Sequence, residues 1–216
     1  RVVGFFVLVA ERGQHQLVHH HRCVHQRRED PGQRLRLVGT VPGAAPQIIL
    51  LPEVAFDEEA FLARVDECVK RDEYCAIVVS EGVRNKEGQF LSDAGVRDAF
   101  GHAQLGGVAP VIAALVKDKL GYKYHWAVAD YLQRAARHIA SATDVEQAYA
   151  MGKAAVEFAL EGRNAIMPTI VRVSDDPYDW KVGSAELGDV ANVEKMLPPE
   201  YISEDGFGVT EACLRY

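Results

Sequence analysis

Two short stretches of this 216-residue chain end in side chains that could bind a phosphorylated sugar. A lone carboxylate, Glu53, follows one apolar run, and a polar corner over residues 131–134, which ends in Arg134, follows another. In an open α/β sheet the carboxyl ends of strands face the ligand crevice. A guanidinium fork there can grip a phosphate, and a carboxylate can accept hydrogen bonds from sugar hydroxyls. The two stretches therefore indicate a candidate site for a sugar phosphate.

Each of these residues also has a purely structural interpretation. Arg134 could be a surface arginine that caps a helix, and Glu53 could pair with a nearby basic side chain. Tyr131 could be a core aromatic residue with a polar tip. From pattern alone these interpretations are the commoner ones, so the binding role depends on the elements that position the residues.

Strand and helix signals alternate from Gln47 onward. Short apolar runs predict strands, and apolar residues at helical spacing predict helices between them. The expected strands cover 47–51, 76–79, 124–129 and 165–173. The expected helices are one capped by Asp57, one that begins at Val108, one capped by Asp144 and ended by Gly162, one over 184–197 and one capped by Thr210. Residues 83–107 predict a long loop. This alternation predicts an α/β fold with a parallel, doubly wound sheet over residues 45–216.

Residues 1–44 lack this alternation and are expected to be irregular. They carry a charge of about +4 and residues 45–216 about −11, for a net charge of −7. The first residue is Arg1 rather than methionine, so we expect a fragment or a processed chain. The histidines of this region are His15, His19, His20, His21 and His25, around Cys23.

The histidine cluster allows two interpretations. One is a zinc site, although no second ligand pair has finger spacing. The other is translation of a GC-rich gene out of frame, which gives arginine, histidine, glutamine and proline without lysine. We hypothesise that residues 1–42 are such a frame-shifted segment.

Composition disfavours several classes of protein. The net charge of −7 disfavours a nucleic-acid partner. No apolar run reaches the roughly 18 residues of a membrane-spanning helix, so no membrane partner is expected. Cys68 and Cys75 are expected to be small buried hydrophobic residues in a reducing compartment.

Residues 45–216 resemble the C-terminal half of a 6-phosphofructokinase, of the bacterial type that commonly uses pyrophosphate. The resemblance is carried by the order and spacing of ILLPEVAF (49–56), AFGHAQLGG (99–107) and YHWAVADYLQR (124–134), with a long helix and strand over 148–167. It implies an incomplete α/β domain of the phosphofructokinase type. It also implies transfer of a phosphoryl group from pyrophosphate, or from ATP as the alternative donor, to the 1-hydroxyl of fructose 6-phosphate.

The resemblance assigns substrate-binding roles to individual residues. They are Glu53, His125, Tyr131, Leu132, Gln133 and Arg134. Glu53 matches the family's sugar-binding glutamate, and residues 131–134 match the loop that holds the 6-phosphate. His125 stands where many relatives carry an arginine for that phosphate, and a neutral histidine gives up the permanent charge. A direct phosphate role for His125 is therefore the weakest of these assignments.

The family's glycine-rich donor loop and its aspartate-bearing catalytic segment have no match in residues 1–44. No catalytic residue and no metal ligand is therefore assigned to this chain, although the family implies Mg²⁺. The resemblance further implies a cytoplasmic homo-oligomer, with this fragment alone inactive. The alternative is a non-catalytic sugar-phosphate-binding or assembly fragment with exposed apolar surface.

Overall fold

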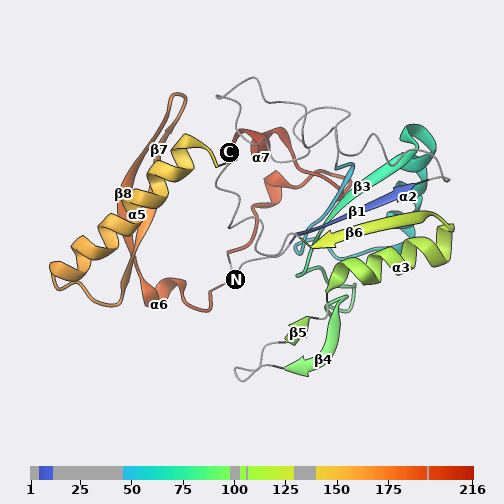
Figure 1. The fold of residues 1–216 in the computed structure, drawn as a ribbon, viewed down its shortest axis with the longest axis horizontal. Helices are drawn as coiled ribbons and strands as arrows, with labels where there is room; N and C mark the ends of the chain where they lie inside the picture. Colours follow the sequence, from blue (N-terminus) through green and yellow to red (C-terminus); the bar gives the residue numbers. More distant parts are fainter. Residues whose placement is uncertain (1–4, 12–45, 98–102, 106, 129–139, 194) are drawn as a thin grey trace. The chain divides into compact units, whose positions relative to one another are not determined.

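The computed structural model describes residues 5–11, 46–97, 103–105, 107–128, 140–193 and 195–216 (Figure 1). The chain divides into two compact units. Unit 1 contains residues 1–135 and 197–215, and unit 2 contains residues 136–196 and 216. The chain therefore leaves unit 1, forms unit 2, and returns to unit 1 near its end.

A four-stranded sheet in the order β2-β3-β1-β6 is the centre of unit 1. The strands are β1 (Phe5–Glu11), β2 (Ile48–Leu50), β3 (Tyr74–Ser80) and β6 (Lys123–Val128). β2 is parallel to β3, whereas β1 is antiparallel to both β3 and β6. β2, β3 and β6 therefore run in one direction, and their carboxyl ends lie at the same edge of the sheet.

Two helices, α2 (Glu58–Asp72) and α3 (Val108–Leu120), pack on one face of this sheet. Asp57 caps α2 as predicted, because its side chain accepts a hydrogen bond from the Ala60 N–H at 3.0 Å. One buried cluster joins both helices to the strands; it includes Ile48, Leu50, Phe61, Val65, Cys68, Cys75, Ile77, Val79, Ile112 and Val116. The predicted α/β architecture is confirmed, and a helical layer on the second face stays a prediction.

Residues 5–11 correct the prediction that residues 1–44 are irregular. They form β1, between β3 and β6, while residues 1–4 and 12–44 lie outside the described part of the chain. Leu8 of β1 is level with Ile77 of β3 and Trp126 of β6. The run is rich in strand-forming residues, and the facing backbones of β3 and β6 need hydrogen-bond partners.

The loop predicted over 83–107 contains a small hairpin of β4 (Asp93–Arg97) and β5 (Ala103–Leu105). The end of the chain adds η2 (Pro199–Tyr201) and α7 (Glu211–Arg215) to unit 1. Thr210 caps α7 as predicted, since its Oγ1 accepts a hydrogen bond from the Cys213 N–H at 3.4 Å.

Unit 2 is a helix, α5 (Ala142–Leu160), beside a two-stranded antiparallel hairpin of β7 (Ile166–Asp175) and β8 (Tyr178–Glu186). Ser141 caps α5 by accepting from the Asp144 N–H at 3.0 Å, so the predicted cap at Asp144 is wrong by one turn. Gly162 follows the helix with φ of 74°, the left-handed conformation expected of a terminating glycine.

The helix predicted over 184–197 is also wrong. β8 continues to Glu186, and among the described residues of this range only α6 (Leu187–Val190) is helical. The reason is pairing, because residues 178–186 lie opposite residues 166–175 of β7, with Ile166 level with Glu186 and Asp175 level with Tyr178. A ladder of hydrogen bonds outweighs a weak helical period in a short segment.

Cys68 and Cys75 are free and fully buried, which confirms their predicted place in the core. Burial in apolar surroundings raises the pKa of the Cys75 thiol above its ordinary value. None of the helices in the described part of the chain is long and apolar enough to span a bilayer.

Candidate functional site

Glu53 lies in the turn after β2, at the carboxyl edge of the sheet. Its Oε1 accepts a hydrogen bond from the main-chain N–H of Leu197 at 2.9 Å. Its Oε2 is buried and has no hydrogen-bond partner among the described residues. A buried carboxylate oxygen costs free energy unless a donor reaches it. Oε2 is therefore the atom at which a ligand hydroxyl, or a group from outside the described residues, would bind.

The turn that carries Glu53 is fixed by its local sequence. Pro52 cannot donate to a ladder and ends β2, and the Val54 N–H closes the turn on the Leu51 carbonyl at 3.2 Å. The turn after β3 packs directly against it. A Cβ at Gly82 would lie 3.0 Å from the Pro52 Cβ, so a larger residue at this position would need Pro52 to shift by a few tenths of an ångström.

His125 lies within β6 and is exposed. It is three residues before Val128, the end of the strand, and so roughly 10 Å back from the carboxyl edge. β6 is also three strands away from β2, a separation of roughly 14 Å. The structure therefore does not bring His125 next to Glu53.

The loop Tyr131, Leu132, Gln133 and Arg134 lies outside the described residues. β6 ends three residues before this loop in the sequence, and its carboxyl end lies at the edge of the sheet that also carries Glu53. The direction of β6 agrees with a site at that edge, and the role of the loop stays a prediction.

A cavity of about 780 Å³ lies beside the first turns of α2 and α3, a feature that the sequence reasoning missed. Acidic residues dominate its charged lining: Asp57, Glu58, Glu59 and Glu87, with Lys86. Lys86 is bound to Asp57 at 2.6 Å, and this hydrogen bond holds the pKa of Asp57 below its ordinary value. Surplus negative charge does not suit a phosphate, so this cavity is a poor candidate for the sugar-phosphate site.

The sequence reasoning also missed Leu197, because a main-chain N–H carries no side-chain signal. In the part of the chain that the structure describes, no three His, Cys, Asp or Glu residues are grouped so that they could hold a metal ion. The described residues therefore do not fit a Mg²⁺ site of their own.

The chain is similar in sequence to a known family and to several known proteins. The sequence model of the family described as Phosphofructokinase matches residues 35–159. Pyrophosphate–fructose 6-phosphate 1-phosphotransferase of Methylococcus capsulatus is 66% identical over 169 residues, which cover 78% of this chain and 40% of that protein. The protein of the same name from Halomonas elongata is 61% identical over 180 residues, covering 83% of this chain and 43% of that protein.

The fold is also similar to a solved structure. The crystal structure of a pyrophosphate-dependent phosphofructokinase from Nitrosospira multiformis matches with a TM-score of 0.67 and 57% identity, over 83% of this chain and 41% of that one. This chain spans about two fifths of the length of the curated relatives it matches.

Proposed function

The chain belongs to the phosphofructokinase family, and we propose that it is the C-terminal part of a pyrophosphate–fructose 6-phosphate 1-phosphotransferase. Such an enzyme transfers a phosphoryl group from pyrophosphate to the 1-hydroxyl of fructose 6-phosphate. The observation that carries the proposal is the 66% identity over 169 residues with a relative of that name. The donor follows from the relatives' names, and ATP is the alternative donor.

The part of the reaction that we assign to this chain is recognition of the acceptor sugar. Glu53 accepts hydrogen bonds from sugar hydroxyls through the oxygen that has no described protein partner. Arg134, with the loop 131–134, grips the 6-phosphate. Holding both ends of the sugar directs its 1-hydroxyl toward the transferring group, and such positioning is a large part of catalysis in phosphoryl transfer.

The remaining machinery belongs, in this proposal, to the rest of a longer protein. Mg²⁺ would neutralise charge on the transferring phosphate, and its ligands would come from outside the described residues. We place the phosphofructokinase region at residues 45–216 and keep the frame-shift hypothesis for residues 1–42; the family match begins somewhat earlier, at residue 35. The enzyme is proposed to be a cytoplasmic homo-oligomer without nucleic-acid or membrane partners.

An activity assay tests the proposal. A full-length protein that contains this chain should turn over fructose 6-phosphate with pyrophosphate and Mg²⁺, while the 216-residue chain alone should not. Turnover with ATP and none with pyrophosphate would select the alternative donor. No turnover with either donor would end the proposal.

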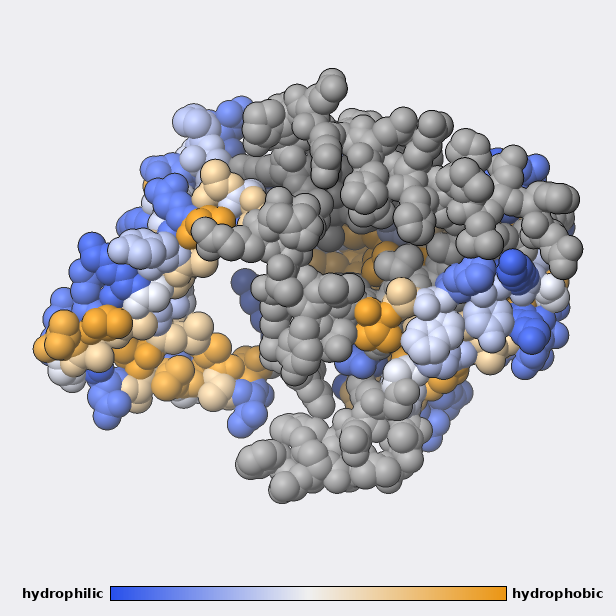
Figure 2. Space-filling model, in the orientation of Figure 1, coloured by the Kyte–Doolittle hydropathy of each residue, from blue (hydrophilic) through white to orange (hydrophobic). Residues whose placement is uncertain are grey.

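A second candidate function, an assembly fragment, is favoured by the surface of α5. Val145, Tyr149, Val156 and Leu160 recur at helical spacing and form what we call the α5 apolar stripe; their exposed fractions are 38%, 75%, 61% and 84%. Figure 2 shows hydrophobic surface at the left end of α5 and along the lower edge of unit 2. The expectation of exposed apolar surface is thereby confirmed.

Soluble proteins rarely leave such a stripe uncovered, so it favours association with further protein. Both candidates expect the isolated 216-residue chain to be inactive, so the assembly candidate is tested by adding the remaining part of a full-length relative as a separate protein. Measurable turnover by the 216-residue chain would refute the assembly candidate. Recovery of turnover only when the remaining part of a full-length relative is added would support it.

A further inference from the structure

The chain returns from unit 2 to unit 1 at Leu197, and this residue contacts the proposed sugar-binding carboxylate. Leu197 is the first residue of the returning segment, and its N–H donates to Glu53 Oε1 at 2.9 Å. The two residues are 144 positions apart in the sequence. The contact is therefore made only when the end of the chain is docked on unit 1.

The segment after Leu197 is bound to the sheet of unit 1 by its own hydrogen bonds. The Ile49 N–H, on β2, donates to the Phe207 carbonyl at 2.8 Å. Ile202 and Val209 form an antiparallel bridge, so the segment folds back on itself. Both ends of this short loop are therefore tied, one to Glu53 and one to the edge strand β2.

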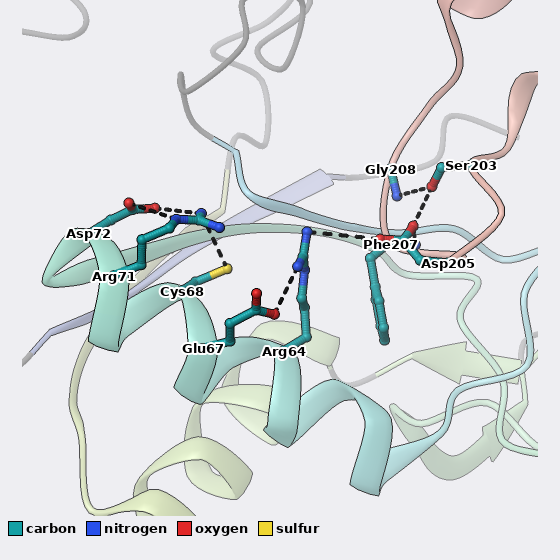
Figure 3. A network of polar contacts seen from close by, with 9 residues as sticks. All are labelled: Arg64, Glu67, Cys68, Arg71, Asp72, Ser203, Asp205, Phe207 and Gly208. Carbon is teal, nitrogen blue, oxygen red and sulfur yellow. Dashed lines mark hydrogen bonds and ion pairs between the residues drawn. The ribbon is translucent and has the colours of Figure 1, made fainter.

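Asp205 closes the loop between them (Figure 3). Its Oδ1 accepts hydrogen bonds from the Ser203 hydroxyl at 2.6 Å and the Phe207 N–H at 3.0 Å. Ser203 Oγ in turn accepts from the Gly208 N–H at 2.8 Å. The Arg64 guanidinium, on α2, lies 3.9 Å from Asp205 Oδ2. This network holds residues 203–208 in one conformation against unit 1.

A glutamate side chain has several rotatable bonds, and a carboxylate held at one oxygen keeps few of its orientations. In Glu53 the held oxygen is Oε1, while Oε2 is buried and unpartnered among the described residues. We propose that the main-chain N–H of Leu197 is a positioning group, held by the segment 197–208, that orients the Glu53 carboxylate for the acceptor sugar. This inference rests on the proposed function of Glu53.

Steady-state kinetics of the full-length protein that contains this chain test the inference. Leu197→Ala shortens the side chain and keeps the N–H, whereas Leu197→Pro removes the N–H as well. Relative to Leu197→Ala, Leu197→Pro should raise the KM for fructose 6-phosphate on the order of tenfold, because a hydrogen bond to a charged group is lost. The KM for pyrophosphate should stay within about a factor of two, a split that general damage to the fold would not produce.

Asp205→Asn provides a milder variant if Leu197→Pro does not fold. It weakens the loop without touching Glu53 and should raise the same KM by a factor of about three, since exposed ion pairs contribute little. Equal KM values for fructose 6-phosphate in Leu197→Ala and Leu197→Pro would overturn the inference. If Leu197→Pro does not fold, an unchanged KM in Asp205→Asn would do so.

Amide hydrogen exchange of the 216-residue chain tests the contact independently of activity. Glu53→Ala should accelerate exchange at the Leu197 N–H on the order of tenfold. The Gly208 N–H, which is bound to Ser203, serves as the control and should not change. An unchanged Leu197 rate in Glu53→Ala would refute the positioning role. Absence of turnover in the unsubstituted full-length protein would instead refute the proposed function.

Discussion

Both units combine helices with a sheet, but they bury very different numbers of side chains. In unit 1 the helices α2 and α3 share one cluster of fully buried side chains with the sheet. Among the described residues of unit 2, only Gln147 and Ala154 are buried. Each unit has one helical layer on one sheet, but one helix on a two-stranded hairpin covers too little surface to enclose a core, whereas two helices on a four-stranded sheet can do so. Secondary structure therefore does not tell which region is stable by itself.

The largest expected effect compares one residue from each unit. Phe61→Ala, in the core of unit 1, should lower the free energy of unfolding by about 3–5 kcal/mol because it leaves a cavity. Leu160→Ala, on the α5 apolar stripe, should change it by less than about 0.5 kcal/mol. Urea unfolding measures both: Trp126 reports on unit 1 for Phe61→Ala in a Trp180→Phe background, and Trp180 reports on unit 2 for Leu160→Ala in a Trp126→Phe background. Similar losses for the two variants would contradict the difference between the units.

The next effect concerns the proposed site in unit 1. In the full-length protein, Arg134→Ala should remove a charge-assisted grip on the 6-phosphate, which contributes about 1.5–3 kcal/mol. The KM for fructose 6-phosphate should rise on the order of 10- to 150-fold, with part of the loss in kcat. Arg134→Lys should recover only part of it, because lysine lacks the fork. Arg137→Ala is the control, and unchanged kinetics in Arg134→Ala would remove the assignment.

A charge introduced on the α5 apolar stripe should affect stability differently in the isolated chain and in a longer protein. Val156→Lys should be nearly neutral in the 216-residue chain, where Val156 is 61% exposed. In a full-length protein that covers the stripe, Val156→Lys should lower the free energy of unfolding by roughly 1–3 kcal/mol, because the lysine ammonium loses its hydration. Ala155→Lys, about 100° around the helix, is the matched control. Thermal unfolding of the two variants and the unsubstituted protein, in the 216-residue chain and in the full-length protein, measures this. Equal effects of Val156→Lys in the two backgrounds would show that the stripe stays uncovered.

The smallest expected effect is the pH dependence of the loop that holds Leu197. Burial opposes ionisation of Asp205, but hydrogen bonds from Ser203 and Phe207 and the charge of Arg64 outweigh it, so the pKa of Asp205 lies below its ordinary value of 3.8. The contribution of ionised Asp205 to the stability of the loop is complete above pH 3.8. It is lost as the pH falls through the lowered pKa of the folded state. The contribution should be at most about 1 kcal/mol, because the ion pair is largely exposed.

Exchange at the Gly208 N–H follows this loop as a function of pH. The ratio of exchange rates in Asp205→Asn and the unsubstituted chain should be largest above pH 3.8 and approach one at lower pH. A ratio that stays constant from neutral to acid pH would show that ionised Asp205 does not stabilise the loop.

The sequence by itself determined the local elements and the family. The Asp57 cap, the terminating Gly162 and the order of β2, α2, β3, α3 and β6 follow from short-range chemistry, since caps, glycine turns and apolar periods act within a few residues. The resemblance over residues 45–216 also pointed to Glu53, because the residues that surround Glu53 in its turn are adjacent to it in the sequence.

Only the tertiary structure decided what depends on distant partners. β1 became a strand because β3 and β6 present unpaired backbone on both sides, and residues 184–186 joined β8 because β7 lies beside them. The contact between Leu197 and Glu53 joins residues 144 positions apart, and a main-chain N–H looks the same in every residue but proline. Such partners are chosen by packing, which no local pattern records.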